Sequence, residues 1–248
     1  MVIDVHTHIW GYNYQKTRAD LLKAIERYKI DKIYVSGLTE YTPTKEKVRE
    51  ANHEVALFIK EHRDCVGGYV YVSPEHDNAV EVIRHGIEDQ GMEGIKLWVS
   101  TFCDEECVNP VMEQAIHYGV PVLIHAFHKA NGQLPKESVG NHVAAIARRY
   151  PKAKLLMAHF GGNCYHGIPA IRECKNVWVD FSGSIFVGDA MDYAVEYLGA
   201  DRILFGTDMN GSYLVSLGQV LEAKLSQEEQ DKILYKNALH LFDRNFLL

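Results

Sequence analysis

The sequence of 248 residues has no long apolar run, no excess of positive charge and no regular cysteine pattern. A membrane-spanning helix needs about 20 consecutive apolar residues, so no membrane association is expected. With 26 Lys and Arg against 33 Asp and Glu the net charge is −7, and a nucleic-acid partner is not expected. The five cysteines are odd in number and irregularly spaced, and no signal peptide is recognisable. These features predict a cytoplasmic protein.

The chain also lacks a Pro-, Gly- or Ser-rich linker, which predicts one domain over residues 1–248. Strand-like and helix-like stretches alternate throughout, as in a parallel sheet covered by helices. No Gly-x-Gly-x-x-Gly follows the first strand-like run, which disfavours a dinucleotide-binding sheet. Eight strand-like runs in a chain of this length favour a closed (β/α)₈ TIM barrel. The runs lie at residues 2–5, 32–36, 66–72, 94–99, 120–124, 154–158, 177–181 and 202–205.

Helical spacing of apolar residues separates several of these runs. A helix is predicted to end before Gly119, and the last one to begin at a capping box formed by Ser226 and Glu229. The helical stretches lie at residues 19–28, 45–62, 78–89, 109–117 and 226–242.

Four of the eight strand-like runs end in side chains that bind metal ions. The first ends in His6 and His8, which share a face because residues two apart in a strand point the same way. Later runs end at His125, His159 and Asp208. The C-terminal ends of barrel strands meet at one mouth, so a metal site is predicted there.

Six segments carry a resemblance to a known family. They are DVHTH at 4–8, GIKL at 94–97, PVLIH at 121–125, AHFGG at 158–162, LFGTD at 204–208 and the ending ILYKNALHLF at 233–242. In this order they resemble the amidohydrolase superfamily, and specifically its amidohydrolase 2 branch, which includes aminocarboxymuconate-semialdehyde decarboxylase.

The resemblance implies that His6, His8, His125 and Asp208 bind one divalent ion, most often zinc, with His159 beside it as an acid/base. A zinc-bound water has a pKa of about 7, and Asp208 or His159 would move its proton. The leading prediction is a metal-dependent hydrolase of a small-molecule amide, lactone or ester. The alternatives are a non-oxidative decarboxylase of an aromatic or muconate-type acid, and a metal-binding barrel without turnover.

Lys96 leaves the number of metal ions open. In binuclear relatives the equivalent lysine is carbamylated and bridges two ions, and His125 and His159 would then hold a second zinc or another divalent metal. Otherwise Lys96 binds a substrate carboxylate, or forms a structural salt bridge, because burying an unpaired ammonium is costly.

The substrate is expected to be a small molecule. Its predicted contacts are Lys96, Trp10, Trp98, Phe127 and His128. A homodimer is compatible with the sequence, although no apolar stripe requires one.

Overall fold

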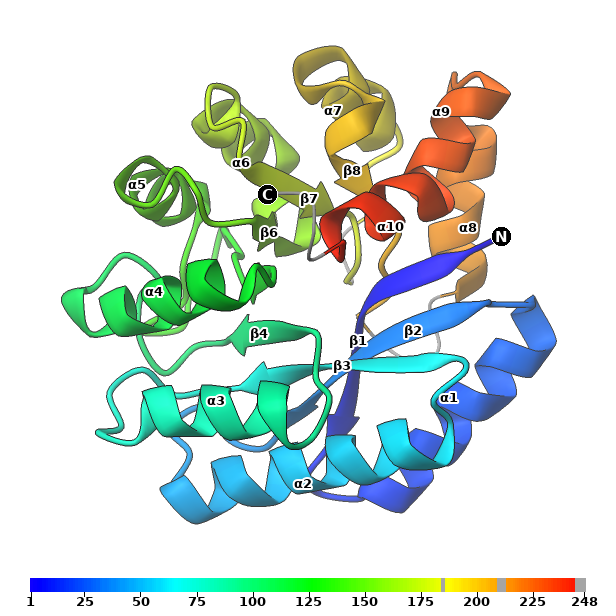
Figure 1. Ribbon diagram of the computed structural model, residues 1–248. Coiled ribbons are helices and arrows are strands. Elements are labelled where there is room, and N and C mark those ends of the chain that lie inside the picture. The colour runs from blue at the N-terminus through cyan, green and yellow to red at the C-terminus, as the bar shows by residue number, and fades with distance from the viewer. Residues whose placement is uncertain (184–185, 209–212, 244–248) are drawn as a thin grey trace.

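Eight parallel strands, each hydrogen-bonded to the next, run in the order β1 to β8 (Figure 1). The structure is a computed structural model, and it describes residues 1–183, 186–208 and 213–243. Backbone bonds from Val5 N to Phe205 O and from Asp208 N to His6 O join β1 to the chain that follows β8. This architecture is consistent with the predicted (β/α)₈ barrel. The strands are β1 Ile3–Trp10, β2 Lys32–Leu38, β3 Val66–Tyr71, β4 Gly94–Leu97, β5 Val122–Ile124, β6 Leu155–Met157, β7 Val177–Asp180 and β8 Ile203–Leu204.

Helices follow the strands, and most of them lie outside the sheet, whereas the last one packs through Ala238 and Leu241 against the inner residues of the strands (Figure 1). Several begin or end at side chains that satisfy free backbone groups. Thr44 accepts a hydrogen bond from Lys47 N at the start of α2, and the predicted capping box of Ser226 and Glu229 is formed. The α-helices are α1 Tyr14–Tyr28, α2 Lys45–Glu61, α3 Ala79–Glu88, α4 Asn109–Tyr118, α5 Gly140–Arg149, α6 Cys164–Ile171, α7 Ala190–Leu198, α8 Tyr213–Glu222, α9 Gln227–Asp231 and α10 Asn237–Leu241.

The predicted helix end at Gly119 is confirmed, since this residue adopts φ 65°, where a side chain would be strained. Two predicted helices differ from the observed ones by more than one residue. α1 begins at Tyr14, five residues before the first predicted position, because Asn13 caps it. The predicted helix at 226–242 is divided by a π-helical turn at Lys232–Lys236, where Ile233 O accepts a bond from Phe205 N.

The strand that carries the histidine pair is longer than predicted. β1 continues to Trp10, so His6 and His8 lie within the strand and not at its end. Its pairing with β2 shifts register between Asp4 and Thr7, as at a β-bulge. A bulge redirects side chains, which helps to aim both imidazoles toward the barrel axis.

Two apolar clusters hold the barrel together. The larger one lies between the sheet and the helices. The smaller one brings together Val5, Tyr69, Leu123, Leu156 and Leu204, which come from five different strands and can meet only inside the barrel. The interior of the barrel beneath the metal-ligand candidates is therefore filled with packed apolar side chains.

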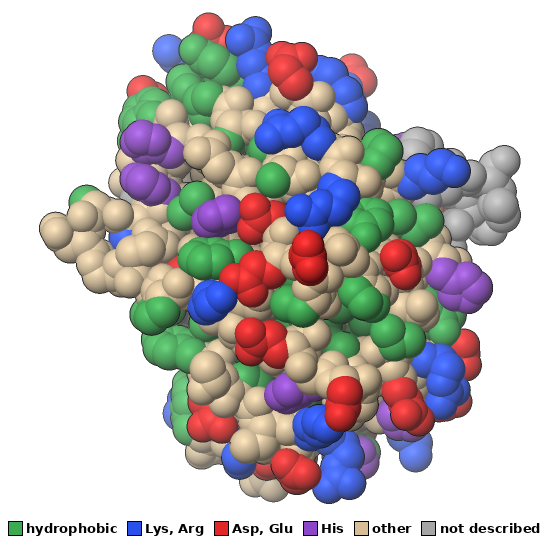
Figure 2. All heavy atoms as spheres, turned by 90° about the vertical axis from the view of Figure 1, so that its left-hand side faces the viewer, with side chains coloured by type: hydrophobic (Ala, Val, Ile, Leu, Met, Phe, Trp, Pro, Cys, Tyr) green, Lys and Arg blue, Asp and Glu red, His purple; other side chains and the backbone are tan. Residues whose placement is uncertain are grey.

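The surface facing left in Figure 1, which carries α4 and α5, shows side chains of both charges interspersed (Figure 2). Among the described residues, no helix has both the length and the apolar character needed to span a membrane.

Candidate active site

The structure brings His6, His8 and Asp208 to a common point. His6 Nε2 lies 3.0 Å from His8 Nε2, and Asp208 Oδ1 lies 3.5 Å from the first nitrogen and 3.2 Å from the second. A single ion can lie about 2 Å from three atoms spaced in this way, which is the usual Zn–N or Zn–O bond length. The spacing therefore fits one divalent ion.

The hydrogen bonds behind the imidazoles support this assignment. His6 Nδ1 lies 3.0 Å from Asp180 Oδ2, and His8 Nδ1 lies 2.7 Å from Ser36 Oγ. An ionised carboxylate only accepts, so Asp180 keeps the proton on His6 Nδ1 and leaves a lone pair on Nε2. That lone pair faces a second imidazole nitrogen and the carboxylate of Asp208. A bound cation would stabilise this arrangement.

A second pair of nitrogens lies beside this group. His125 Nδ1 is 3.2 Å from His159 Nε2, and Lys96 Nζ is 3.3 Å from His6 Nε2. His125 is thus in contact with His159. Among the described residues, two groups have ligand atoms that all lie within 4.8 Å of one another, namely His6, His8 and Asp208, and His6, His159 and Asp180, and His125 belongs to neither. All six side chains with predicted metal or catalytic roles are within one cluster.

Two of these residues have backbone conformations that non-glycine residues rarely adopt. His159 has φ 61° and Asp208 has φ 64°. Asp180 Oδ1 accepts from His159 N, and His6 O accepts from Asp208 N, so neighbouring strands hold both conformations. Such strain costs about 1–3 kcal/mol per residue and is concentrated at functional sites.

Burial and charge set the protonation of the cluster. Burial, together with the positive charge of Lys96, lowers the pKa of His6 well below its ordinary value. Burial likewise lowers the pKa of His125 to about 4 and that of Lys96 to about 8. Burial opposes ionisation of Asp208, but the charge of His159 and a hydrogen bond from His8 outweigh it and hold the pKa of this carboxyl well below its usual range. Neutral imidazoles and an ionised carboxylate are the forms that bind metal ions.

Aromatic rings form one side of the mouth. The Trp10 ring lies 5.7 Å from the His8 ring and 5.9 Å from the Trp98 ring, between centroids. Phe127 packs against His159 at 5.3 Å and stacks near His125 at 6.0 Å. Of the four ring side chains predicted to contact the substrate, Trp10 and Phe127 thus pack against histidines of the cluster, and Trp98 packs against Trp10.

His128 lies differently. Its ring stacks on His166 of α6 at 4.4 Å, and no contact between this ring and the ligand cluster is found within the described residues. It lines a hollow of about 420 Å³ together with Lys129, Asn131 and Tyr165. A direct role of His128 at the reacting atoms has no support in this geometry.

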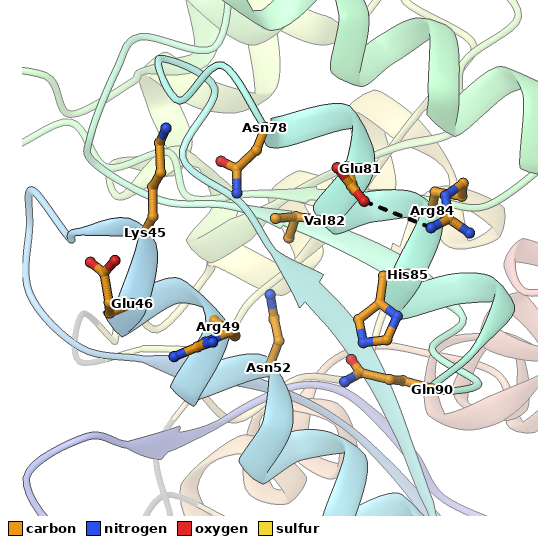
Figure 3. A pocket seen from close by; sticks show the side chains of 10 residues that line it. All are labelled: Lys45, Glu46, Arg49, Asn52, Asn78, Glu81, Val82, Arg84, His85 and Gln90. Atoms are coloured by element: carbon orange, nitrogen blue, oxygen red, sulfur yellow. Dashed lines mark ion pairs between the residues drawn. The ribbon is translucent and has the colours of Figure 1, made fainter.

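Another cavity, of about 410 Å³, lies outside the barrel between α2 and α3 (Figure 3). Most of its charged side chains have partners of opposite sign, such as Lys45 with Asp77, and Arg84 with Glu81 and Glu88. None of the predicted site residues lines this cavity. It is therefore not the place of the chemistry.

Sequence reasoning missed three polar residues that hold the cluster. Asp180 ends β7 and contacts His6, Ser36 lies in β2 behind His8, and Glu137 contacts His125 Nε2 at 2.9 Å. Asp180 could have been predicted from the sequence, because it ends a strand-like run as the ligand candidates do. Nothing local distinguished Glu137, which lies in a loop twelve residues after His125. Asp4, two residues before His6 in β1, supports the site from below, since it accepts bonds from His6 N and Thr207 Oγ1.

Comparison with known proteins identifies the family of this chain. A sequence model of the amidohydrolase family matches residues 3–244. The chain belongs to the amidohydrolase 2 family. The predicted family is therefore confirmed. No curated protein matches the sequence.

Solved structures of this family are similar over nearly the whole chain. 2,6-Dihydroxybenzoate decarboxylase from Rhizobium is 16% identical, with a TM-score of 0.75 and coverage of 98% of this chain and 99% of that one. A dihydroxybenzoic acid decarboxylase from Polaromonas, solved with manganese and 2-nitroresorcinol, is 18% identical, with a TM-score of 0.73 and coverage of 98% and 97%. 4-Oxalomesaconate hydratase from Rhodopseudomonas palustris is 16% identical, with a TM-score of 0.73 and coverage of 99% and 96%. At these identities the similarity shows the fold.

Proposed function

We propose that this amidohydrolase-family protein is a metal-dependent, non-oxidative decarboxylase of a small aromatic or unsaturated carboxylic acid. The observation that carries the proposal is Lys96. Its ammonium group is fully buried and forms no ion pair within 4.0 Å among the described residues, so the negative charges of Asp208 and Asp180 act on it only from a greater distance. A buried cation without an adjacent counter-charge is costly, and a substrate carboxylate would supply that charge.

In this proposal His6, His8, His125 and Asp208 hold one divalent ion at the C-terminal mouth of the barrel. Zinc suits three imidazoles and a carboxylate, and manganese is the alternative seen in the decarboxylase from Polaromonas. When bound, the ion would supply positive charge that polarises the oxygens of the substrate. Trp10 would contact a planar substrate from the side of His8.

The chain's own residues account for the proton and the carboxylate. Lys96 binds the substrate carboxylate and orients it. His159 delivers a proton from Nε2 to the carbon that bears this group, and its Nδ1 is held by Ser182 O at 3.0 Å. The carbon–carboxylate bond then breaks, its electron pair remains with the protonated carbon, and CO₂ leaves. Asp208 stays ionised and serves as a ligand.

The solved structures support this reaction class, because those from Rhizobium and Polaromonas are decarboxylases of dihydroxybenzoic acids. The leading prediction from the sequence was hydrolysis, and it remains the second candidate for one reason. His125 Nδ1 and His159 Nε2 face each other at 3.2 Å beside Lys96, as two ligands of a second ion would. With Lys96 carbamylated, such a pair of ions would favour attack by water on a lactone, amide or ester.

The two candidates are separated by assaying zinc- and manganese-loaded protein with aromatic and unsaturated acids for CO₂ release, and with lactones for hydrolysis. Intact mass spectrometry reports a carbamate on Lys96. CO₂ release that is lost in Lys96→Met and kept in Lys23→Met supports the decarboxylase. Hydrolysis without CO₂ release, together with two ions per chain, would replace it with the hydrolase.

A further inference from the structure

The imidazole of His125 is held by a buried carboxylate that no sequence motif indicated. Glu137 is 2% exposed, although it lies in the loop between β5 and α5. Its Oε1 lies 2.9 Å from His125 Nε2, the nitrogen that points away from the other ligands. A carboxylate on the far nitrogen of a metal-binding histidine fixes the tautomer and the orientation of the ring.

The backbone explains why Glu137 returns to His125 across a long loop. Ala126, next to His125, forms a bridge with Ser138, next to Glu137. Phe127 N donates to Ser138 O at 2.8 Å and closes the base of the loop. The loop therefore leaves the barrel at His125 and comes back to the same place.

The carboxylate of Glu137 is fully satisfied where it lies. Besides His125, it accepts bonds from Lys129 Nζ at 2.7 Å, Gln133 Nε2 at 2.9 Å and Leu134 N at 3.1 Å. These partners are all N–H donors, and they compensate for the burial of the carboxylate. A carboxylate surrounded by N–H donors acts as an acceptor toward His125 as well, which places the His125 proton on Nε2.

We infer that Glu137 is a positioning residue, which fixes the proton of His125 on Nε2 and thereby turns the Nδ1 lone pair toward the metal ion. Phe127, stacked near His125 at an interplanar angle of 13°, holds one face of the same ring. His159 Nε2, 3.2 Å from Nδ1, marks the side of the ring on which the ion would lie. The inference rests on the proposed function, because it requires His125 to be a metal ligand.

The first test uses the wild-type protein and needs no substrate. In the metal-free protein, ¹⁵N NMR of the imidazoles should show His125 protonated at Nε2 and unprotonated at Nδ1. A His125 protonated at Nδ1 would overturn the inference, since that nitrogen could not then bind the ion.

The second test measures metal affinity by competition with a chromophoric chelator, using zinc alone. Glu137→Gln keeps the side-chain size but presents an amide, which can donate as well as accept and no longer fixes the tautomer. Its affinity should fall by about 10- to 100-fold. The matched control is Glu105→Gln. Glu105 lies in the loop between β4 and α4 and pairs with Lys136, which is next to Glu137, so this variant disturbs the same loop without touching His125 and should leave the affinity unchanged.

A double variant separates positioning from general damage to the loop. If Glu137 acts through His125, then Glu137→Gln should have no further effect in a His125→Ala background. An equal loss of affinity in both backgrounds would overturn the inference. The inference would also be overturned if Glu137→Gln bound zinc as tightly as wild type while His125→Ala bound it weakly. If His125→Ala itself binds zinc as tightly as wild type, the proposed metal site fails, and the inference fails with it.

Discussion

Replacing Lys96 by Met should stabilise the metal-free protein, because it removes a charge that folding takes out of water. Burial lowers the pKa of Lys96 from 10.5 to about 8. Each pKa unit corresponds to about 1.4 kcal/mol, so the buried charge costs about 3 kcal/mol at neutral pH. Met has a similar length and no charge, so Lys96→Met should gain up to this amount at pH 7.

The gain in stability of Lys96→Met over wild type should decrease as the pH rises. Below pH 8 the lysine is charged in both the folded and the unfolded state, and the full cost is present. Between pH 8 and 10.5 the folded protein loses this proton while the unfolded chain keeps it, so the stability of the wild type rises toward that of the variant. Above pH 10.5 the difference should vanish.

The measurement is urea unfolding of chelator-treated wild type and Lys96→Met at pH 7, 8, 9 and 10. Taking the difference between the two proteins cancels other groups that titrate in this range. Lys23→Met serves as the control, because the Lys23 side chain is 79% exposed and should show no such pH-dependent gain. If the difference in stability between Lys96→Met and wild type is near zero, or constant from pH 7 to 10, then Lys96 carries no costly buried charge. The reason for expecting a substrate carboxylate beside it would then be lost.

Three further outcomes are expected. His159→Asn should lower kcat by about 10²- to 10⁴-fold with the metal content per chain unchanged, and loss of the metal would speak against an acid role. Asp180→Asn should weaken zinc binding by about 10- to 100-fold in a chelator competition, because the amide no longer fixes the proton on His6 Nδ1, and unaltered affinity would contradict this role. Removing the ion should lower Tm by about 5–10 °C, since a ligand present at 100 times its Kd stabilises by about 2.7 kcal/mol, and zinc should restore it. A Tm unaffected by chelation would argue against a tightly bound ion.

The sequence predicted the strands well because buried parallel strands consist of continuous apolar residues. All eight predicted runs overlap the strands of the structure. Boundaries set by contacts with distant residues were predicted less well. In the π-helical turn at Lys232–Lys236, Ile233 O accepts a bond from Phe205 N, nearly thirty residues earlier, and local spacing could not indicate this contact.

The sequence by itself determined which side chains reach the barrel mouth, because each ends or lies in a recognisable strand and parallel strands end together. His6, His8, His125, His159 and Asp208 needed no coordinates to be named. Only the tertiary structure showed which polar side chains hold these residues by hydrogen bonds. The imidazole nitrogens that face away from the common point are contacted by Asp180, Ser36 and Glu137. Ser36 reaches its nitrogen because β2 pairs with β1, and Asp180 reaches its nitrogen because β7 and β1 lie on either side of β8 and the residue that follows it. Glu137 reaches its nitrogen because its loop folds back onto the end of β5. Those relations exist only between segments, so no pattern within one segment can reveal them.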